Sequence, residues 1–171
     1  KSVLAQSILV NSLYMEMYFM ENNLDDLCYE FFREFSRYEY CLKACGLHHK
    51  IRDAKANWDE YAKQVSGTIN NTTDPELIAA ITYFKKYPPK KQIIKDDSLV
   101  WDDSLPQEKD LAKFIFLLIR RVRNNLFHGG KFNGKWFESE RSEALLQHGL
   151  VILRRCGAEH SEVSKAYSGI A

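Results

Sequence analysis

Hydrophobic side chains recur every three or four residues along most of this chain, the spacing that places them on one face of an α-helix. The clearest example is the stretch 24–45, where an aromatic-rich stripe precedes Gly46, a residue type that commonly ends a helix. The stripe consists of Phe31, Phe32, Phe35, Tyr38 and Leu42. The same spacing predicts helices over 2–21, 58–69 and 138–155, and a last short helix after Gly157.

Two further helices are predicted from their end signals. Thr73 and Glu76 have the spacing of a capping box with Pro75 between them, so a helix is expected to begin there and to end at Tyr87. The second helix is strongly apolar and is expected to begin with a cap at Asp103 or Ser104, and to run to about Phe127.

The stretch 91–103 has a different pattern, with two short apolar runs around Asp96, Asp97 and Ser98. This pattern is typical of a small β-hairpin. The sequence therefore predicts an all-α helical bundle with short extra helices and a small hairpin near 91–103.

Composition indicates one compact domain over residues 1–171, because 45% of the residues are hydrophobic and 27% are charged. The formal net charge of +1 excludes a strongly basic protein, so any nucleic-acid contact must be a local patch. Residues 3–20 are apolar but are interrupted by Gln6 and Glu16, which favours core packing or a dimer contact over a membrane span. We expect a cytoplasmic protein without a membrane partner.

The four cysteines, Cys28, Cys41, Cys45 and Cys156, contain no C-x-x-C pair, which favours thiols over a disulfide framework. Cys41, Cys45, His48 and His49 are the one cluster with metal-ligand chemistry. Gly46 is expected to end the helix between the cysteines and the histidines, so we expect buried small cysteines and no metal site.

The most informative stretch is 120–132, RRVRNNLFHGGKF, where arginines, asparagines and one histidine end an apolar helix. Arginine binds phosphate in a fixed fork geometry, and histidine titrates near neutral pH. The arrangement is typical of a phosphate-handling site. The plainer interpretation is a basic helix end that complements the helix dipole.

Helix geometry separates these side chains. On an ideal helix Asn124 and His128 share a face, and Arg121 projects about 20° and Asn125 about 60° from the direction of His128. Arg123 projects about 140° away from His128. Three explanations remain: the Arg123 side chain wraps back, His128 has left the helix, or Arg123 acts across an interface with a second copy.

Arg123, Asn124 and His128 fit the R-N-x-x-x-H signature of the HEPN superfamily, which the chain resembles. The segments 31–44, 57–61 and 88–91 are similar to stretches of stand-alone bacterial HEPN proteins, so the resemblance covers roughly 28–132. One departure is Gly130, at a position where some HEPN toxins carry a tyrosine that an antitoxin modifies.

The resemblance implies a metal-independent endoribonuclease without a cofactor, acting as a homodimer whose motif helices form one cleft. It implies that His128 is the general acid or base, that Arg123 stabilises phosphoryl charge, and that Asn124 holds the histidine or the phosphate by hydrogen bonding. Further RNA contacts are expected from Arg121, Asn125, Lys131 and Arg37, with Glu39 orienting an arginine.

The sequence leaves other interpretations open. A surface ion pair is the plain alternative for Arg37 and Glu39, and solvent exposure is the plain alternative for Lys131. The whole chain could also be a non-catalytic module that binds RNA or a nucleotide, or a helical oligomerisation scaffold. For the nuclease we expect a toxin, stress or phage-defence role, with an antitoxin or another neighbouring-gene product as a candidate partner.

Overall fold

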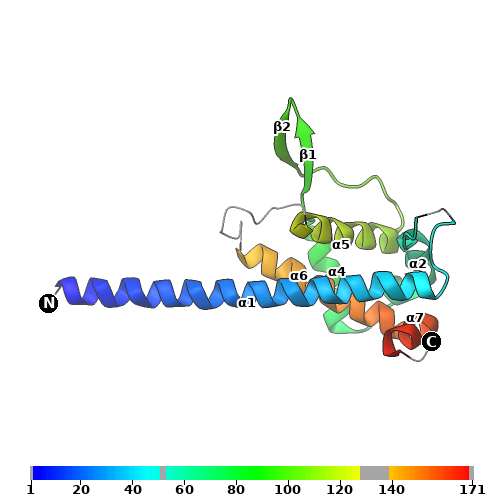
Figure 1. Ribbon diagram of the computed structural model, residues 1–171, viewed down its shortest axis with the longest axis horizontal. Coiled ribbons are helices and arrows are strands. Elements are labelled where there is room, and N and C mark those ends of the chain that lie inside the picture. The colour runs from blue at the N-terminus through cyan, green and yellow to red at the C-terminus, as the bar shows by residue number, and fades with distance from the viewer. Residues whose placement is uncertain (1, 51–52, 128–138, 170–171) are drawn as a thin grey trace.

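A computed structural model describes the backbone of residues 2–50, 53–127 and 139–169, and the side chains of 23–50, 53–127 and 140–169. Within these residues the chain forms helices and one antiparallel hairpin (Figure 1). The elements are α1 (Ser2–Ala44), α2 (Trp58–Gln64), α3 (Ser66–Asn70), α4 (Pro75–Lys86), β1 (Lys91–Lys95), β2 (Ser98–Asp102), α5 (Leu111–Phe127), α6 (Ser139–Glu159) and α7 (Ser161–Ser168). The predicted all-α fold with a small hairpin is confirmed.

Helix α1 is one continuous helix of 43 residues, whereas two helices were expected over 2–21 and 24–45. No glycine or proline lies between Ser2 and Ala44, and Asn22 and Asn23 lower helix propensity without breaking the helix. The N-terminal part of α1 extends well beyond the other elements (Figure 1). The helix ends as predicted at Gly46, whose φ of 82° is left-handed.

The core lies between α1, α6, α5 and the shorter helices. Phe31, Phe35 and Leu42 of the aromatic-rich stripe are buried there, but Phe32 is 39% exposed and packs on Phe127 with ring centroids 5.0 Å apart. Helix α6 approaches α1 closely, because a Cβ atom at Gly157 would overlap the ring of Tyr38. Gly157 does not end this helix as the sequence had suggested. Helix α6 continues to Glu159, and the last helix, α7, begins at Ser161.

Several boundaries differ from the predicted ones. The expected helix over 58–69 is divided at Val65 into α2 and α3. Helix α4 begins as predicted, but Asp74 is its cap, accepting hydrogen bonds from the backbone N–H groups of Glu76 and Leu77.

Helix α5 begins later than predicted. The Asp110 carboxylate accepts a hydrogen bond from the Lys113 N–H at 3.0 Å, so Asp110 caps the helix in place of Asp103 or Ser104. Pro106 therefore precedes α5. The C-terminal boundary at Phe127 matches the prediction.

The hairpin stands away from the helices, above α5 in Figure 1. Its turn residues Asp96 and Asp97 have φ of 50° and 57°, the backbone that a two-residue hairpin turn requires and that Asp tolerates better than most residues. Gln92 pairs with Trp101, and Ile94 pairs with Leu99. These four side chains share one face, because residues directly opposite each other, and those two positions along a strand, point the same way.

Candidate nucleic-acid interface

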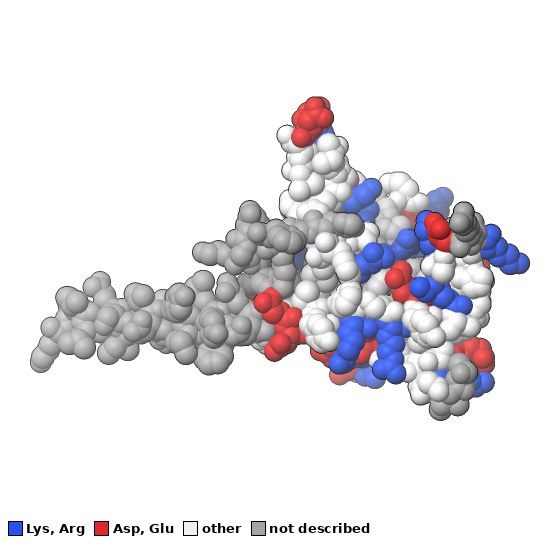
Figure 2. Space-filling model, in the orientation of Figure 1, with Lys and Arg blue, Asp and Glu red and all other residues white. Residues whose placement is uncertain are grey.

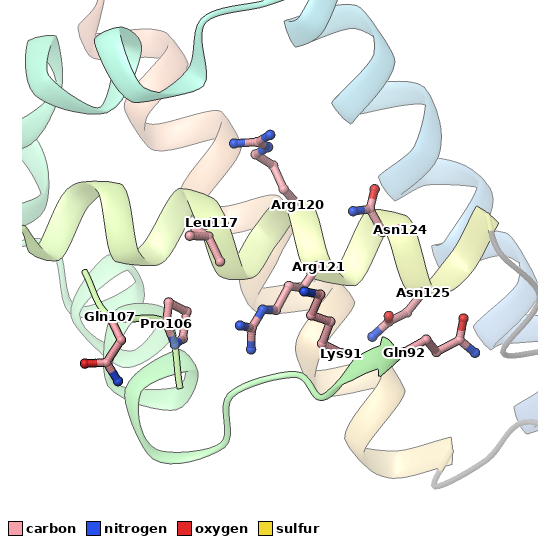
Figure 3. A pocket seen from close by; sticks show the side chains of 9 residues that line it. All are labelled: Lys91, Gln92, Pro106, Gln107, Leu117, Arg120, Arg121, Asn124 and Asn125. Carbon is pink, nitrogen blue, oxygen red and sulfur yellow. The ribbon is translucent and has the colours of Figure 1, made fainter. Parts of the chain in front are cut away.

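Helix α5 has a buried face and a polar C-terminal half. Its buried residues are Ala112, Ile115, Phe116, Leu118, Ile119 and Val122. The polar residues of the sequence motif follow on the remaining surface, where the helix passes the base of the hairpin (Figure 3). Core packing of the apolar face therefore fixes the direction in which each motif side chain points.

A pocket of about 660 Å³ lies along this polar surface. Figure 3 shows Arg120 and Asn124 on one side of α5, and Arg121 and Asn125 on the side toward the hairpin. The complete lining is Lys91, Gln92, Pro106, Gln107, Leu117, Arg120, Arg121, Asn124 and Asn125. Three of these residues are basic, and among the described residues no carboxylate lines the pocket.

Two of the lining residues also hold the walls together. The Arg121 guanidinium donates to the Ser104 carbonyl oxygen at 3.1 Å, which ties the segment before α5 to the helix. The Asn125 amide donates to the Lys90 carbonyl oxygen at 2.8 Å, which fixes the base of the hairpin. Both residues were expected to contact RNA, and each has this structural contact in addition.

The described lining of the pocket carries a positive charge. Partial burial lowers the pKa of Arg121, and the nearby Asp102 carboxylate opposes this shift. Arginine titrates so far above neutrality that Arg121 stays charged. Arg120 is exposed, and its ion pair with Asp59 is long, at 3.9 Å, so within the described residues its guanidinium is available to an anion.

Arg123 points away from this pocket, toward α1. Its guanidinium lies 3.5 Å from the Glu39 carboxylate, with its carbon 5.1 Å from the centre of the Phe35 ring and 5.9 Å from that of Phe127. The side chain is only 28% exposed, and its Nε atom is buried without a hydrogen-bond partner in the described part of the chain. The helix arithmetic had separated Arg123 from the face of Asn124, and these contacts agree with it.

The Glu39 carboxylate faces the Arg123 guanidinium. The same carboxylate oxygen that faces Arg123 accepts a hydrogen bond from the indole of Trp58 at 3.4 Å. A contact chain thus runs from α2 through α1 to α5. Glu39 of α1 therefore contacts side chains of both α2 and α5.

Arg37 does not join this group. Its guanidinium stacks 3.9 Å from the centre of the Tyr167 ring and donates to the Tyr167 carbonyl oxygen. The Tyr167 hydroxyl donates to the buried Glu34 at 2.6 Å, so these residues join α7 to α1. The structure therefore places Arg37 at the α1–α7 junction and not beside Arg123.

His128 and Lys131 lie outside the described residues. The described part of the motif comprises two groups: Arg121, Asn124 and Asn125 at the pocket, and Arg123 against α1. Sequence reasoning did not select Lys91, Gln92 or Arg120. A signal for Arg120 was present, because Arg120 and Asn124 are four residues apart and share a helix face.

The candidate metal ligands do not form a site. Cys41 is buried and accepts a contact from the Cys45 thiol at its carbonyl oxygen, whereas His48 and His49 are exposed beyond the helix end. Burial raises the pKa of both thiols, which opposes thiolate formation. In the part of the chain that the structure describes, no group of three or more His, Cys, Asp or Glu residues could hold a metal ion.

None of the described helices combines the length and the apolar composition needed to cross a membrane. No protein-family model matches the chain, and neither a curated protein nor a solved structure does. The chemistry of the α5 pocket is therefore the basis for a functional proposal.

Proposed function

We propose that this chain is a HEPN-type domain that acts as a metal-independent endoribonuclease, with RNA bound along α5. The observation that carries the proposal is the convergence of Lys91, Arg120 and Arg121 with Asn124 and Asn125 at one pocket. This pocket lies at the end of the helix that leads directly into His128. Basic side chains that suit phosphate, amide donors and the candidate acid–base residue His128 therefore follow one another in one segment of the sequence.

The charge distribution supports a local RNA site. Figure 2 shows several Lys and Arg side chains below the hairpin, on the face that carries α5, with a few Asp and Glu side chains among them, while the hairpin tip is acidic. With a net charge of only +1, attraction to RNA depends on this patch and not on the whole protein. Arginine and asparagine offer several N–H donors to phosphate oxygens without requiring a metal.

In the proposed reaction the RNA 2′-oxygen attacks the adjacent phosphorus, and the bond from phosphorus to the 5′-oxygen breaks. The products are a 2′,3′-cyclic phosphate and a 5′-hydroxyl. The 2′-hydroxyl gives up its proton and the leaving 5′-oxygen takes one up; His128 performs one of these transfers, as general base or as general acid, and Asn124 orients the histidine or the phosphate. The exposed edge of Arg123, held by Glu39, stabilises charge on the phosphoryl oxygens.

The nuclease is proposed to act as a cytoplasmic homodimer, whose two motif helices form one cleft. This arrangement would add a second histidine and a second arginine to the phosphate. It also supplies a reason for an Arg123 that points away from Asn124, because the arginine of one copy would complete the site of the other.

A second candidate is a non-catalytic RNA-binding module. The pairing of Arg123 with Glu39 and its packing between two aromatic rings favour this function, because an arginine so engaged already contributes to packing of the chain. In that case the pocket alone binds the RNA backbone, and no bond is broken.

Cleavage of end-labelled RNA in excess EDTA separates the two candidates. The nuclease should cleave under these conditions, and His128→Ala should abolish cleavage while RNA binding remains. Arg155→Gln is the matched control, because Arg155 pairs with Asp74 and Glu76 outside the pocket. Full activity of His128→Ala, or strict dependence on added metal, would contradict the proposed chemistry. Binding without cleavage by the wild type would select the binding module.

A further inference from the structure

The hairpin presents an exposed apolar face that no described helix covers. Trp101 is 45% exposed, Leu99 64% and Ile94 69%. The strand register places these three side chains on one face together with Gln92. An exposed tryptophan beside two exposed aliphatic side chains is a common feature of binding surfaces, since water solvates this area poorly.

This face is continuous with the α5 pocket. Gln92, which lines the pocket, lies directly opposite Trp101 across the two strands. The hydrogen bond from Asn125 to the Lys90 carbonyl oxygen fixes the start of β1 against α5. The indole ring of Trp101 therefore lies next to the pocket, whose basic and amide side chains suit phosphate.

We propose that the hairpin is the base-binding arm of the RNA site, on which an unpaired base stacks against Trp101. The inference rests on the proposed function, in that the pocket binds the RNA backbone. Every base offers a flat aromatic surface, and an indole stacks on it without regard to sequence. In a duplex the bases are stacked on one another, so the arm selects single-stranded segments.

Charge directs an RNA strand to the base of the hairpin. Lys91 and Lys95 lie on the opposite face of the same hairpin, and Lys91 also reaches the pocket. The tip carries Asp96 and Asp97, which repel phosphate. The backbone of a bound strand is therefore attracted at the base of the hairpin and repelled at its tip, which limits the arm to the bases next to the pocket.

Two probes of equal length distinguish stacking from phosphate binding: a fluorescent oligouridine and the corresponding abasic ribose-phosphate chain. Binding is measured by anisotropy in EDTA, with His128→Ala in every protein so that no probe is cleaved. Trp101→Leu keeps an apolar side chain but removes the ring. It should weaken oligouridine binding about tenfold and leave abasic binding within about twofold.

Three control variants complete the test. Trp101→Phe should retain most of the affinity, because a smaller ring still stacks. Tyr40→Leu removes an aromatic ring of α1 that is even more exposed than Trp101 and lies outside the pocket lining, so it should change neither affinity. Arg120→Gln should weaken both probes, because it removes a phosphate contact.

The possible outcomes distinguish a failure of the base-binding arm from a failure of the RNA site as a whole. Unchanged oligouridine binding by Trp101→Leu, together with weaker binding by Arg120→Gln, would overturn the base-binding arm and leave the RNA site intact. Equal loss of both probes in Trp101→Leu would also overturn the arm, since loss of stacking affects only the probe that has bases. Absence of binding to either probe by the His128→Ala parent would refute the arm and the proposed function together.

Discussion

The salt dependence of RNA binding is a direct measure of how many phosphates the α5 pocket neutralises. The described lining contains three basic side chains, Lys91, Arg120 and Arg121. For single strands the logarithm of the affinity falls with the logarithm of the salt concentration with a slope of about −0.7 per neutralised phosphate. Three contacts therefore give a slope of about −2.1 per chain, or about an 18-fold loss of affinity between roughly 50 and 200 mM salt.

Removing one contact should reduce this slope by a fixed amount. In Arg120→Gln two contacts remain, so the slope should become about −1.4 and the loss over the same range about sevenfold. Arg120 is the suitable residue for this test because its ion pair with Asp59 is long and exposed, and its removal leaves the contacts of Arg121 and Asn125 intact.

The assay is anisotropy of a labelled oligouridine titrated at five or more potassium chloride concentrations in EDTA, in the His128→Ala background. Arg155→Gln removes the same charge from α6, away from the pocket, and should keep the parent slope. A parent slope near zero would refute phosphate binding by this patch. An unchanged slope in Arg120→Gln, or an equal decrease in Arg155→Gln, would show that charge acts through the whole protein and not through these residues.

Two further predictions concern the fold. Gly157→Ala should lower the free energy of unfolding by about 1–3 kcal/mol in urea titrations, because its Cβ atom would overlap the Tyr38 ring. Gly67→Ala, where nothing lies within 4 Å of the added atom, should be neutral or stabilising, and an equal loss there would exclude the steric cause. Burial, with a smaller effect of Glu159, raises the pKa of the Cys156 thiol to about 12, so ionisation of the unfolded thiol should lower stability above its usual pKa. The loss should be about 1–2 kcal/mol between pH 8.5 and 10, and Cys156→Ser should lack it; identical pH profiles would contradict the buried thiol.

Local sequence determined which segments form helices and where several of them end. Residues 24–45 repeat their apolar positions with helical spacing, and Gly46 supplies the left-handed backbone at the end. The hairpin was also predictable from local sequence, because Asp96 and Asp97 tolerate the positive φ of its turn. Such signals act within a few residues of one another and do not require the rest of the chain.

Where several residues could cap a helix, the local sequence did not determine at which of them the helix begins. Asp103, Ser104 and Asp110 can each cap a helix, and only Asp110 does so. The Ser104 carbonyl oxygen instead accepts a hydrogen bond from Arg121, seventeen residues later in the sequence. A contact of that range depends on how the segment before α5 lies against the helix.

In the candidate site, too, some features follow from the local sequence and others from tertiary packing. Helix geometry alone separated Arg123 from Asn124, because the angle between side chains follows from their spacing. Tertiary packing decided what each face contacts: Glu39 and Phe35 for Arg123, and the base of the hairpin, with Lys91 and Gln92, for the pocket. These partners come from other elements, and the burial of apolar faces that brings the elements together acts across the whole chain.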